Sequence, residues 1–193
     1  VGTPSWGVDF PSVGKDGPLL GLPYAYRDPH TDCAPEEYFS KVLPREEVYG
    51  ATGIQIMQFN SLYQLYAMQR DRSSQLAAAE RLLFMPDALS YLLTGEMVTE
   101  YTIASTSQLL NPRTKRIEAR LLEKMGLSAE LFPPIVMPGH RIGTLRAELA
   151  AACGLPQLPV VVGAGLGTGS CVPAPQSLPG RFANLSTGPG SLF

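Results

Sequence analysis

Cysteine and histidine are scarce in this sequence, and their scarcity limits the chemistry that the chain can offer. The 193 residues include three cysteines, Cys33, Cys153 and Cys171, and two histidines, His30 and His140. The cysteines are scattered and show no CxxC spacing, so we expect reduced thiols in a cytoplasmic protein. Neither histidine lies beside a pair of potential ligands, so no metal site is expected.

Long apolar runs and concentrations of charge are also absent. Apolar stretches such as 155–166 are short and are interrupted by proline and glycine, so we expect no membrane span. The formal net charge is −2, and the 17% of charged residues are of both signs and interspersed. No basic stripe therefore predicts binding to nucleic acid or to an anionic membrane. With 45% hydrophobic residues, the composition is typical of a folded globular chain.

The two ends of the sequence resemble interior positions of a longer chain. The sequence begins at Val1 without a methionine, and residues 1–10 already read like the middle of a sheet. It stops at Phe193, directly after a loop of glycine, serine and threonine where a strand should continue. We therefore expect a piece of a longer protein.

Hydrophobic spacing and turn residues predict a mixed α/β chain whose middle is helical. Residues 6–13 favour a strand, 14–17 a turn, and 19–26 a returning arm. Asn60 is a good N-cap for a helix over 60–70. Further helices are expected over 35–41, 45–49, 73–83, 87–94, 115–125 and 144–153, and further strands over 158–162 and 181–185.

Two strands in the last third each lead into a loop of glycine, serine and threonine. The loops are 163–170 and 186–191, and α/β proteins surround ligands with such loops at strand ends. The glycine spacing does not fit a dinucleotide-binding fingerprint, and no Gly-Lys-Ser/Thr follows to make a P-loop. From spacing alone, a tight turn that allows close packing is the better interpretation.

Five short groups of residues are informative through their order and spacing, and they extend along nearly the whole chain. They are Trp6-Gly7-Val8-Asp9-Phe10, Gly21-Leu22-Pro23-Tyr24-Ala25-Tyr26-Arg27-Asp28, Phe59-Asn60-Ser61-Leu62-Tyr63-Gln64-Leu65, Met85-Pro86-Asp87 with Leu93-Thr94-Gly95-Glu96, and Thr99-Glu100-Tyr101-Thr102-Ile103-Ala104-Ser105-Thr106. In order and spacing they resemble the FGGY carbohydrate kinase family, and the first three resemble its rhamnulokinases. The resemblance implies an α/β, actin-like (ribonuclease H-like) sugar-kinase fold. It implies a partial N-terminal sugar-binding domain over 1–165, then the cleft loop and the start of the C-terminal domain over 166–193.

The same resemblance implies a reaction, which is ATP-dependent phosphorylation of the 1-hydroxyl of L-rhamnulose in L-rhamnose catabolism. The implied partners are a small-molecule ketose, ATP and magnesium, and the implied location is the cytoplasm. Such chemistry needs an aligned hydroxyl, a carboxylate that takes its proton, and cations or amides on the phosphate oxygens.

Site residues are carried over from the family one at a time. Gly7 matches a glycine whose backbone lies against the sugar, and a strand glycine that avoids a steric clash fits it equally well. Leu166, Gly167 and Thr168 fall where the family has a substrate-binding His-Asp-Thr, so Gly167 stands at the position of the proton-accepting aspartate. Pro189 falls where the family has a threonine next to the ATP phosphates.

These departures leave two classes of function open, and whether this chain is itself an enzyme stays open with them. Gly167 cannot accept a proton, and Pro4 and Gly190 replace a family aspartate and tryptophan. The family's first phosphate-binding hairpin and its adenosine site fall outside 1–193. We therefore expect the chain alone to be inactive and to bind ATP and magnesium poorly. The alternative to a piece of a kinase is a non-catalytic sugar-binding or structural remnant.

Three acidic residues have competing interpretations. Asp87 follows Pro86, which favours a helix N-cap over a catalytic acid. Asp9 could reach a cleft, although the resemblance treats its strand as scaffold facing the sugar. Asp28 either pairs with Arg27 or contacts substrate.

Overall fold

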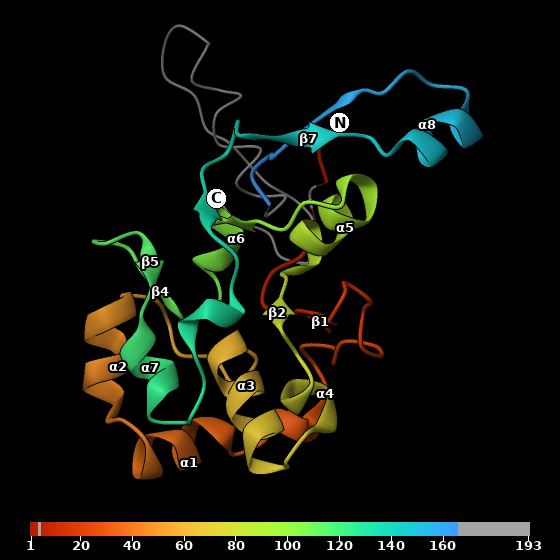
Figure 1. The fold of residues 1–193 in the computed structure, drawn as a ribbon. Coiled ribbons are helices and arrows are strands. Elements are labelled where there is room, and N and C mark those ends of the chain that lie inside the picture. Colours follow the sequence, from red (N-terminus) through yellow and green to blue (C-terminus); the bar gives the residue numbers. More distant parts are fainter. Residues whose placement is uncertain (4, 166–193) are drawn as a thin grey trace, which may run out of the picture.

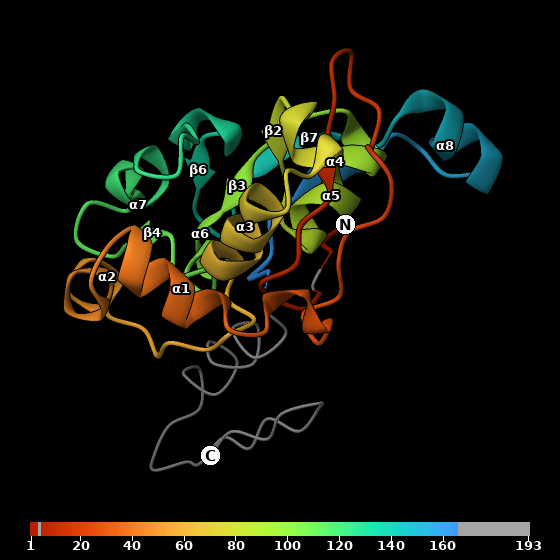
Figure 2. The same ribbon diagram turned by 90° about the horizontal axis from the view of Figure 1, so that it is seen from below.

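The computed structural model describes residues 1–3 and 5–165, which form helices and short strands (Figure 1). The helices are α1 (Ala34–Lys41), α2 (Arg45–Thr52), α3 (Ser61–Arg70), α4 (Ser74–Ala77), α5 (Met85–Thr94), α6 (Tyr101–Ala104), α7 (Ala119–Glu123) and α8 (Ala147–Cys153), with 3-10 turns η1 (Pro29–Thr31) and η2 (Ala129–Leu131). The strands are β1 (Ser12–Val13), β2 (Arg81–Leu82), β3 (Thr99–Glu100), β4 (Leu110–Asn111), β5 (Arg116–Ile117), β6 (Ile135–Val136), β7 (Arg141–Thr144) and β8 (Pro159–Val161). In both views α8 lies at one end, and α1, α2 and α7 lie at the opposite end (Figures 1 and 2).

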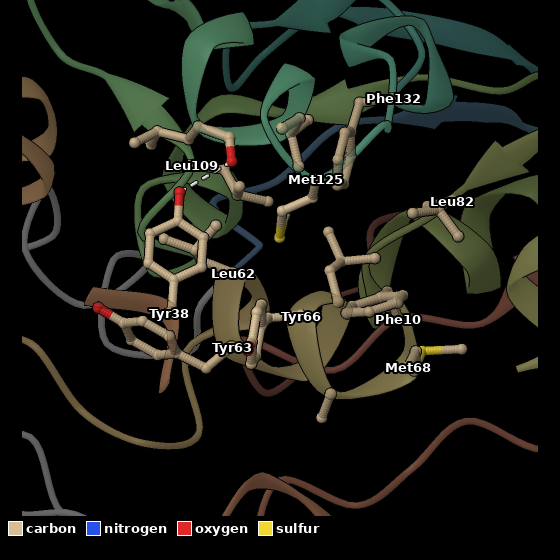
Figure 3. Close-up of a cluster of buried hydrophobic side chains, with 14 of the residues drawn as sticks. Phe10, Tyr38, Leu62, Tyr63, Tyr66, Met68, Leu82, Leu109, Met125 and Phe132 are labelled. Atoms are coloured by element: carbon tan, nitrogen blue, oxygen red, sulfur yellow. Dashed lines mark hydrogen bonds between the residues drawn. The ribbon is translucent and has the colours of Figure 1, made fainter. Parts of the chain in front are cut away.

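A hydrophobic core surrounds α3, whose residues 61–68 are all buried. Tyr38 of α1 packs edge-to-face on Tyr63 and Tyr66, with ring centroids 5.9 and 5.7 Å apart. Its hydroxyl donates to the Leu121 carbonyl of α7 at 2.9 Å (Figure 3). Because α3 is buried on nearly every side, it is the central element of this helical body.

The chain's first residues run beside β8, on the side away from β7. The Val1 amino group donates to the Pro159 carbonyl, and Val161 N–H donates to the Val1 carbonyl, both at 2.9 Å. β7 and β8 pair antiparallel. β8 is therefore flanked on both sides, which confirms the strand predicted over 158–162 and its interior place.

Four of the helices predicted in the first half of the chain are confirmed, and they are α1, α2, α3 and α5. α1 and α2 cover the residues predicted for them, and α3 begins directly after Asn60. α5 ends at Gly95, whose φ of 87° is the left-handed conformation that glycine adopts at low cost. Within residues 1–3 and 5–165, no helix is both long and apolar enough to cross a membrane.

The helix predicted over 73–83 is wrong in its second half. Ser73 caps the short α4 by accepting from Leu76 N–H, but the chain then becomes β2. Leu82 pairs with Ser12 of β1, so backbone bonds to a distant segment replace helical ones. Local spacing could not reveal that partner.

Three further boundaries differ from prediction. Residues 6–11 are not a strand, and the predicted hairpin is short: Val13 bridges Leu19 and Leu20 N–H donates to the Ser12 carbonyl at 2.8 Å, but the returning arm does not continue to residue 26. The helix predicted over 115–125 shrinks to α7, because Arg116 and Ile117 pair with β4. The helix predicted over 144–153 loses Thr144 to β7. The strand predicted over 181–185 lies outside the described residues.

Candidate functional site

The structure describes one of the predicted site residues, Gly7. The remaining four, Leu166, Gly167, Thr168 and Pro189, lie outside the described residues, as do Pro4 and Gly190. Residue 165 is described, however, so the point from which the predicted cleft loop starts is known.

Gly7 packs closely against Thr106, just beyond the end of α6. A Cβ at position 7 would lie 2.7 Å from the Thr106 hydroxyl oxygen and 3.2 Å from its Cβ. That hydroxyl is held in place, because it donates to the Ile103 carbonyl at 2.8 Å. This contact supports the packing interpretation of Gly7, and a role against the sugar stays a prediction.

The residue after Gly7 adopts a strained backbone conformation. Val8 has a φ of 67°, and Asp9 N–H donates across it to the Gly7 carbonyl at 2.9 Å. A γ-turn of this hand is rare, and positive φ is unfavourable for a β-branched residue. The Val8 carbonyl accepts from the Ser61 hydroxyl and from the Gln64 amide, so the start of α3 holds the turn in place.

Asp9 is buried beneath this turn, with 3% of its surface exposed. Its Oδ2 accepts from the Trp6 indole N–H at 2.8 Å and from Tyr26 N–H at 3.2 Å, while Oδ1 accepts from the Gln64 amide at 3.1 Å. Burial raises the pKa of the Asp9 carboxyl, and its hydrogen-bond donors oppose that rise. With both oxygens occupied, Asp9 is a structural acceptor, and the idea that it reaches an open cleft is wrong.

The end of the segment after β8 is fastened to a second buried carboxylate, Glu100. Gly165 N–H donates to Glu100 Oε2 at 2.9 Å, and the Gly165 carbonyl accepts from Ser5 N–H at 2.9 Å. A Cβ at position 165 would lie 2.7 Å from the same Glu100 oxygen, so a side chain does not fit there. Glu100 also caps α6, accepting from Thr102 N–H and Ile103 N–H at 2.6 and 2.9 Å.

These contacts bring Gly7 and Gly165 to one edge of the fold. The segment 159–165 is hydrogen-bonded to the start of the chain at both of its ends, through Val1 and through Ser5, and the two run in the same direction. Trp6 and Gly7 therefore follow the first segment at the edge where Gly165 ends the described part of the second. The carboxyl ends of adjacent parallel segments are where α/β folds bind ligands. We refer to Trp6–Asp9, Glu100 and Gly165 as the strand-end edge.

Asp87 lies next to this edge and does not cap its helix. The N-cap of α5 is Phe84, and Asp87 is the third helical residue. Both carboxylate oxygens lie 3.2 Å from the N–H of Glu100. Burial raises the pKa of Asp87 to about 8, and the neighbouring Glu100 charge adds to the rise. The N-cap interpretation is therefore wrong, because the carboxyl joins α5 to the start of α6.

Arg27 and Asp28 do not pair with each other in the described structure. The Arg27 guanidinium donates to the Tyr26 hydroxyl at 3.2 Å and lies over that ring. Asp28 instead caps η1, accepting from His30 N–H at 2.9 Å. Each residue has its own neighbour, and a substrate contact for either stays a prediction.

Other possible sites are separate from this edge. A wide, open depression of about 720 Å³ is lined by Arg81, Lys115, Arg116, Phe132 and neighbouring residues, and Gly7 is not among them. Among the residues that the structure describes, no three His, Cys, Asp or Glu side chains are grouped to hold a metal. Cys33 and Cys153 are free and exposed.

The sequence interpretation did not identify Glu100 or the link between Trp6 and Asp9. No capping signal was available for Glu100, because N-cap positions favour Asp, Asn, Ser and Thr rather than Glu. Trp6 and Asp9 are three residues apart in a segment predicted to be a strand, where side chains at that spacing point to opposite faces. Their contact depends on the turn at Val8, which sequence patterns do not predict.

Comparison with known proteins gives this edge a family context. The model of the "FGGY family of carbohydrate kinases, N-terminal domain" matches residues 25–170. The chain is 56% identical over all 193 residues to the rhamnulokinase of Bacteroides thetaiotaomicron, covering 40% of that protein. It is 39% identical over 193 residues to the rhamnulokinase of Enterococcus faecalis, covering 38% of it. The chain thus spans about two fifths of the length of these relatives.

Solved structures agree on the fold. Gluconate kinase from Lactobacillus acidophilus superposes with a TM-score of 0.76 at 20% identity, over 83% of this chain and 33% of that one. Plasmodium falciparum glycerol kinase with ADP superposes with a TM-score of 0.72 at 14% identity, over 84% and 33%. The predicted α/β, actin-like (ribonuclease H-like) sugar-kinase fold is confirmed. The chain belongs to the FGGY family of carbohydrate kinases.

Proposed function

We propose that this chain is the sugar-binding part of a rhamnulokinase-type enzyme, which phosphorylates the 1-hydroxyl of L-rhamnulose with ATP. The observation that carries the proposal is the 56% identity over the whole chain to a protein named rhamnulokinase. The chain's own contribution is to bind and orient the ketose, which is a large part of phosphoryl-transfer catalysis.

The strand-end edge supplies the groups for that task. In this proposal Gly7 lets the backbone approach a bound sugar, and Leu166, Gly167 and Thr168, which follow Gly165 in the sequence, are assigned to the same ligand. In this proposal Gly167 takes the position of the proton acceptor without providing a carboxylate. Loss of a general base commonly lowers the rate about 10²–10⁴-fold.

ATP and magnesium are the cofactors that the proposal requires, and we place both outside the described residues. Pro189 is the position we assign next to the ATP phosphates. Residues 1–3 and 5–165 hold no cluster of three metal-ligating side chains, so no catalytic step is derived through a metal from them. Because the reaction would consume ATP and a catabolic ketose, we propose that the protein acts in the cytoplasm.

A second candidate function is a sugar-binding remnant without catalysis. Gly167 favours it, since glycine cannot take a proton from the hydroxyl. Both candidates predict that the purified chain shows no ATP-dependent phosphorylation of L-rhamnulose above background in a coupled ADP-release assay. Robust turnover would disprove the expected inactivity of the chain. It would also disprove the assignment of Gly167 to the position of the proton acceptor.

Restoring the family residues separates the two candidates and tests the register. In a protein completed with the flanking family segments, Gly167→Asp with Leu166→His should restore measurable kinase activity, and Pro189→Thr should increase it. Leu166→Asp alone is the matched control and should stay inactive, because a base acts only within hydrogen-bond reach of the hydroxyl. Equal activity from both variants would show that the register is wrong. A folded but inactive completed protein favours the remnant.

A further inference from the structure

Trp6 combines solvent exposure with a fixed orientation. It is the sole tryptophan of the sequence, and 48% of its surface is exposed. Its indole N–H nevertheless donates to Asp9 Oδ2 at 2.8 Å. A single exposed apolar side chain is ordinary on a protein surface, so the fixed orientation of this ring is the observation that distinguishes it. The hydrogen bond fixes one edge of the ring and leaves its apolar surface accessible.

Asp9 is itself held from three directions, so the ring has a rigid anchor. Besides the indole N–H, its oxygens accept from Tyr26 N–H and from the Gln64 amide. A buried carboxylate is costly unless its oxygens are hydrogen-bonded, and here each oxygen has a donor. The Trp6 indole is therefore tied to α3 through Asp9 and Gln64.

The backbone beside Trp6 is strained in a way that supports the same orientation. Val8 is the one β-branched residue with positive φ among the described residues. Its γ-turn folds Asp9 back beneath Trp6, and Ser61 and Gln64 hold the turn through the Val8 carbonyl. Backbone strain of this kind concentrates at ligand-binding sites, where surrounding contacts maintain it.

The position of Trp6 matches that of a ligand contact. Trp6 follows Ser5, whose N–H bonds to Gly165, and it precedes Gly7, which rests against Thr106. Trp6 is thus at the strand-end edge, directly after the residue that bonds to Gly165. Small-ligand sites combine an aromatic surface with a few oriented polar groups.

We propose that Trp6 is the aromatic surface on which the sugar stacks its C–H face, and that Asp9 is the residue that positions this ring. The inference rests on the proposed function and adds a specificity determinant to it. The C–H groups on one face of a ketose are apolar and slightly positive, so they complement the electron-rich face of an indole. A deoxy sugar such as L-rhamnulose, with a methyl group in place of one hydroxymethyl, suits such a surface.

Tryptophan emission tests the proposal directly, because all of it comes from Trp6. L-rhamnulose is titrated into the purified chain while emission and acrylamide quenching are followed. We expect a saturable change in emission and a lower quenching constant, because the sugar covers the ring. Titration calorimetry gives the dissociation constant without relying on the ring, and circular dichroism verifies the fold of each variant.

Substitutions then separate positioning from general structure. Trp6→Ala should raise the dissociation constant about tenfold, and Trp6→Phe should raise it less because a ring remains. Asp9→Asn places an amide NH₂ against groups that already donate hydrogen bonds. This variant should raise the dissociation constant several-fold. In the Trp6→Phe background Asp9→Asn should add little, since phenylalanine has no N–H to hold. An equal effect in both backgrounds would show that Asp9 does not act through Trp6.

The outcomes distinguish this inference from the proposed function. If L-rhamnulose binds by calorimetry but leaves emission unchanged, and Trp6→Ala binds as tightly, the stacking role is overturned and the function stands. If D-xylulose changes Trp6 emission and L-rhamnulose does not, the stacking role is supported and the assigned substrate is wrong. If the folded chain binds no ketose, both are overturned for this chain. Should Asp9→Asn fail to fold, the two Trp6 variants still decide the stacking role, because the ring is half exposed.

Discussion

The helical body around α3 and the strand-end edge are held together by different contacts. In the body, Tyr38, Leu62 and Tyr63 are fully buried and pack on one another's apolar surfaces (Figure 3). At the edge, the buried groups include the carboxyls of Asp9 and Glu100, each satisfied by several donors. Apolar burial stabilises a fold in proportion to area, whereas buried carboxyls at best offset their own desolvation. The helical body therefore contributes stability, whereas the strand-end edge holds its residues in one conformation.

The largest expected effect tests the role of the body. Tyr38→Ala removes a side chain with 0% exposure and should lower the free energy of unfolding by about 3–5 kcal/mol. Tyr38→Phe is the matched control, because it keeps the ring and removes only the hydroxyl that donates to Leu121. Tyr38→Phe should lower the free energy of unfolding by about 1–3 kcal/mol, since the buried Leu121 carbonyl loses its donor. Urea unfolding followed by circular dichroism measures both, and equal losses would contradict packing as the main contribution.

The same contrast explains what could be predicted from sequence. In the body, the apolar periodicity after Asn60 marks α3 because packing and sequence spacing have the same period. Even there the role of Asn60 differs from prediction. Its side chain accepts from Met57 N–H and donates to the Thr106 carbonyl, and it makes no capping bond to α3.

At the edge, the decisive contacts join residues that are distant in sequence. Glu100 holds Gly165 across 65 positions, and Ser5 bonds to the same glycine from the other end of the chain. No local pattern encodes such partners, and the turn at Val8 runs against the conformational preference of valine. The family resemblance predicted Gly7 and the loop after residue 165 as site positions, but the roles of the Asp9 and Glu100 carboxylates came only from the structure.

An intermediate effect is expected from the edge itself. Glu100→Gln replaces one acceptor oxygen with NH₂, which must face either Thr102 N–H or the donors from Ile103 and Gly165. We expect a loss of about 1.5–3 kcal/mol in unfolding free energy, as for a buried charge-assisted hydrogen bond. Amide hydrogen exchange should show Gly165 losing protection while α3 keeps it.

Glu118→Gln is the control for that substitution. Glu118 is partly exposed and accepts from the Asn111 amide at 2.8 Å in the hairpin of β4 and β5. Glu118→Gln should lower the free energy of unfolding by about 1 kcal/mol or less, and it should leave the hydrogen exchange of the Gly165 amide unchanged. If Glu100→Gln left Gly165 as protected as before, the carboxylate would not be what fastens the segment after β8.

Taken per pH unit, the smallest effect concerns the Asp87 carboxyl, whose pKa is raised to about 8 by burial and by the neighbouring Glu100. In the unfolded chain an aspartate titrates near 3.9, so between about pH 4 and 8 the folded protein holds a proton that the unfolded chain has released. Unfolding free energy therefore falls as pH rises through this window, by at most about 1.4 kcal/mol per pH unit. Above the folded pKa both states are ionised and the dependence ends.

Asp87→Asn should remove that dependence, because the amide is neutral at every pH and keeps an acceptor oxygen for Glu100 N–H. We expect the unfolding free energy of the variant to match that of the parent near pH 5 and to exceed it near pH 8, where each kcal/mol raises the melting temperature by roughly 2–4 °C.

Asp71→Asn is the control. Hydrogen bonds from Arg70 lower the pKa of the Asp71 carboxyl, so its contribution changes only at more acidic pH. The slope of unfolding free energy between pH 5 and 8 should therefore stay as in the parent. Melting curves at pH 5, 6, 7 and 8 decide the matter. Parallel pH profiles for the parent and Asp87→Asn would mean that Asp87 is already ionised in the fold, and that the edge tolerates a second buried negative charge beside Glu100.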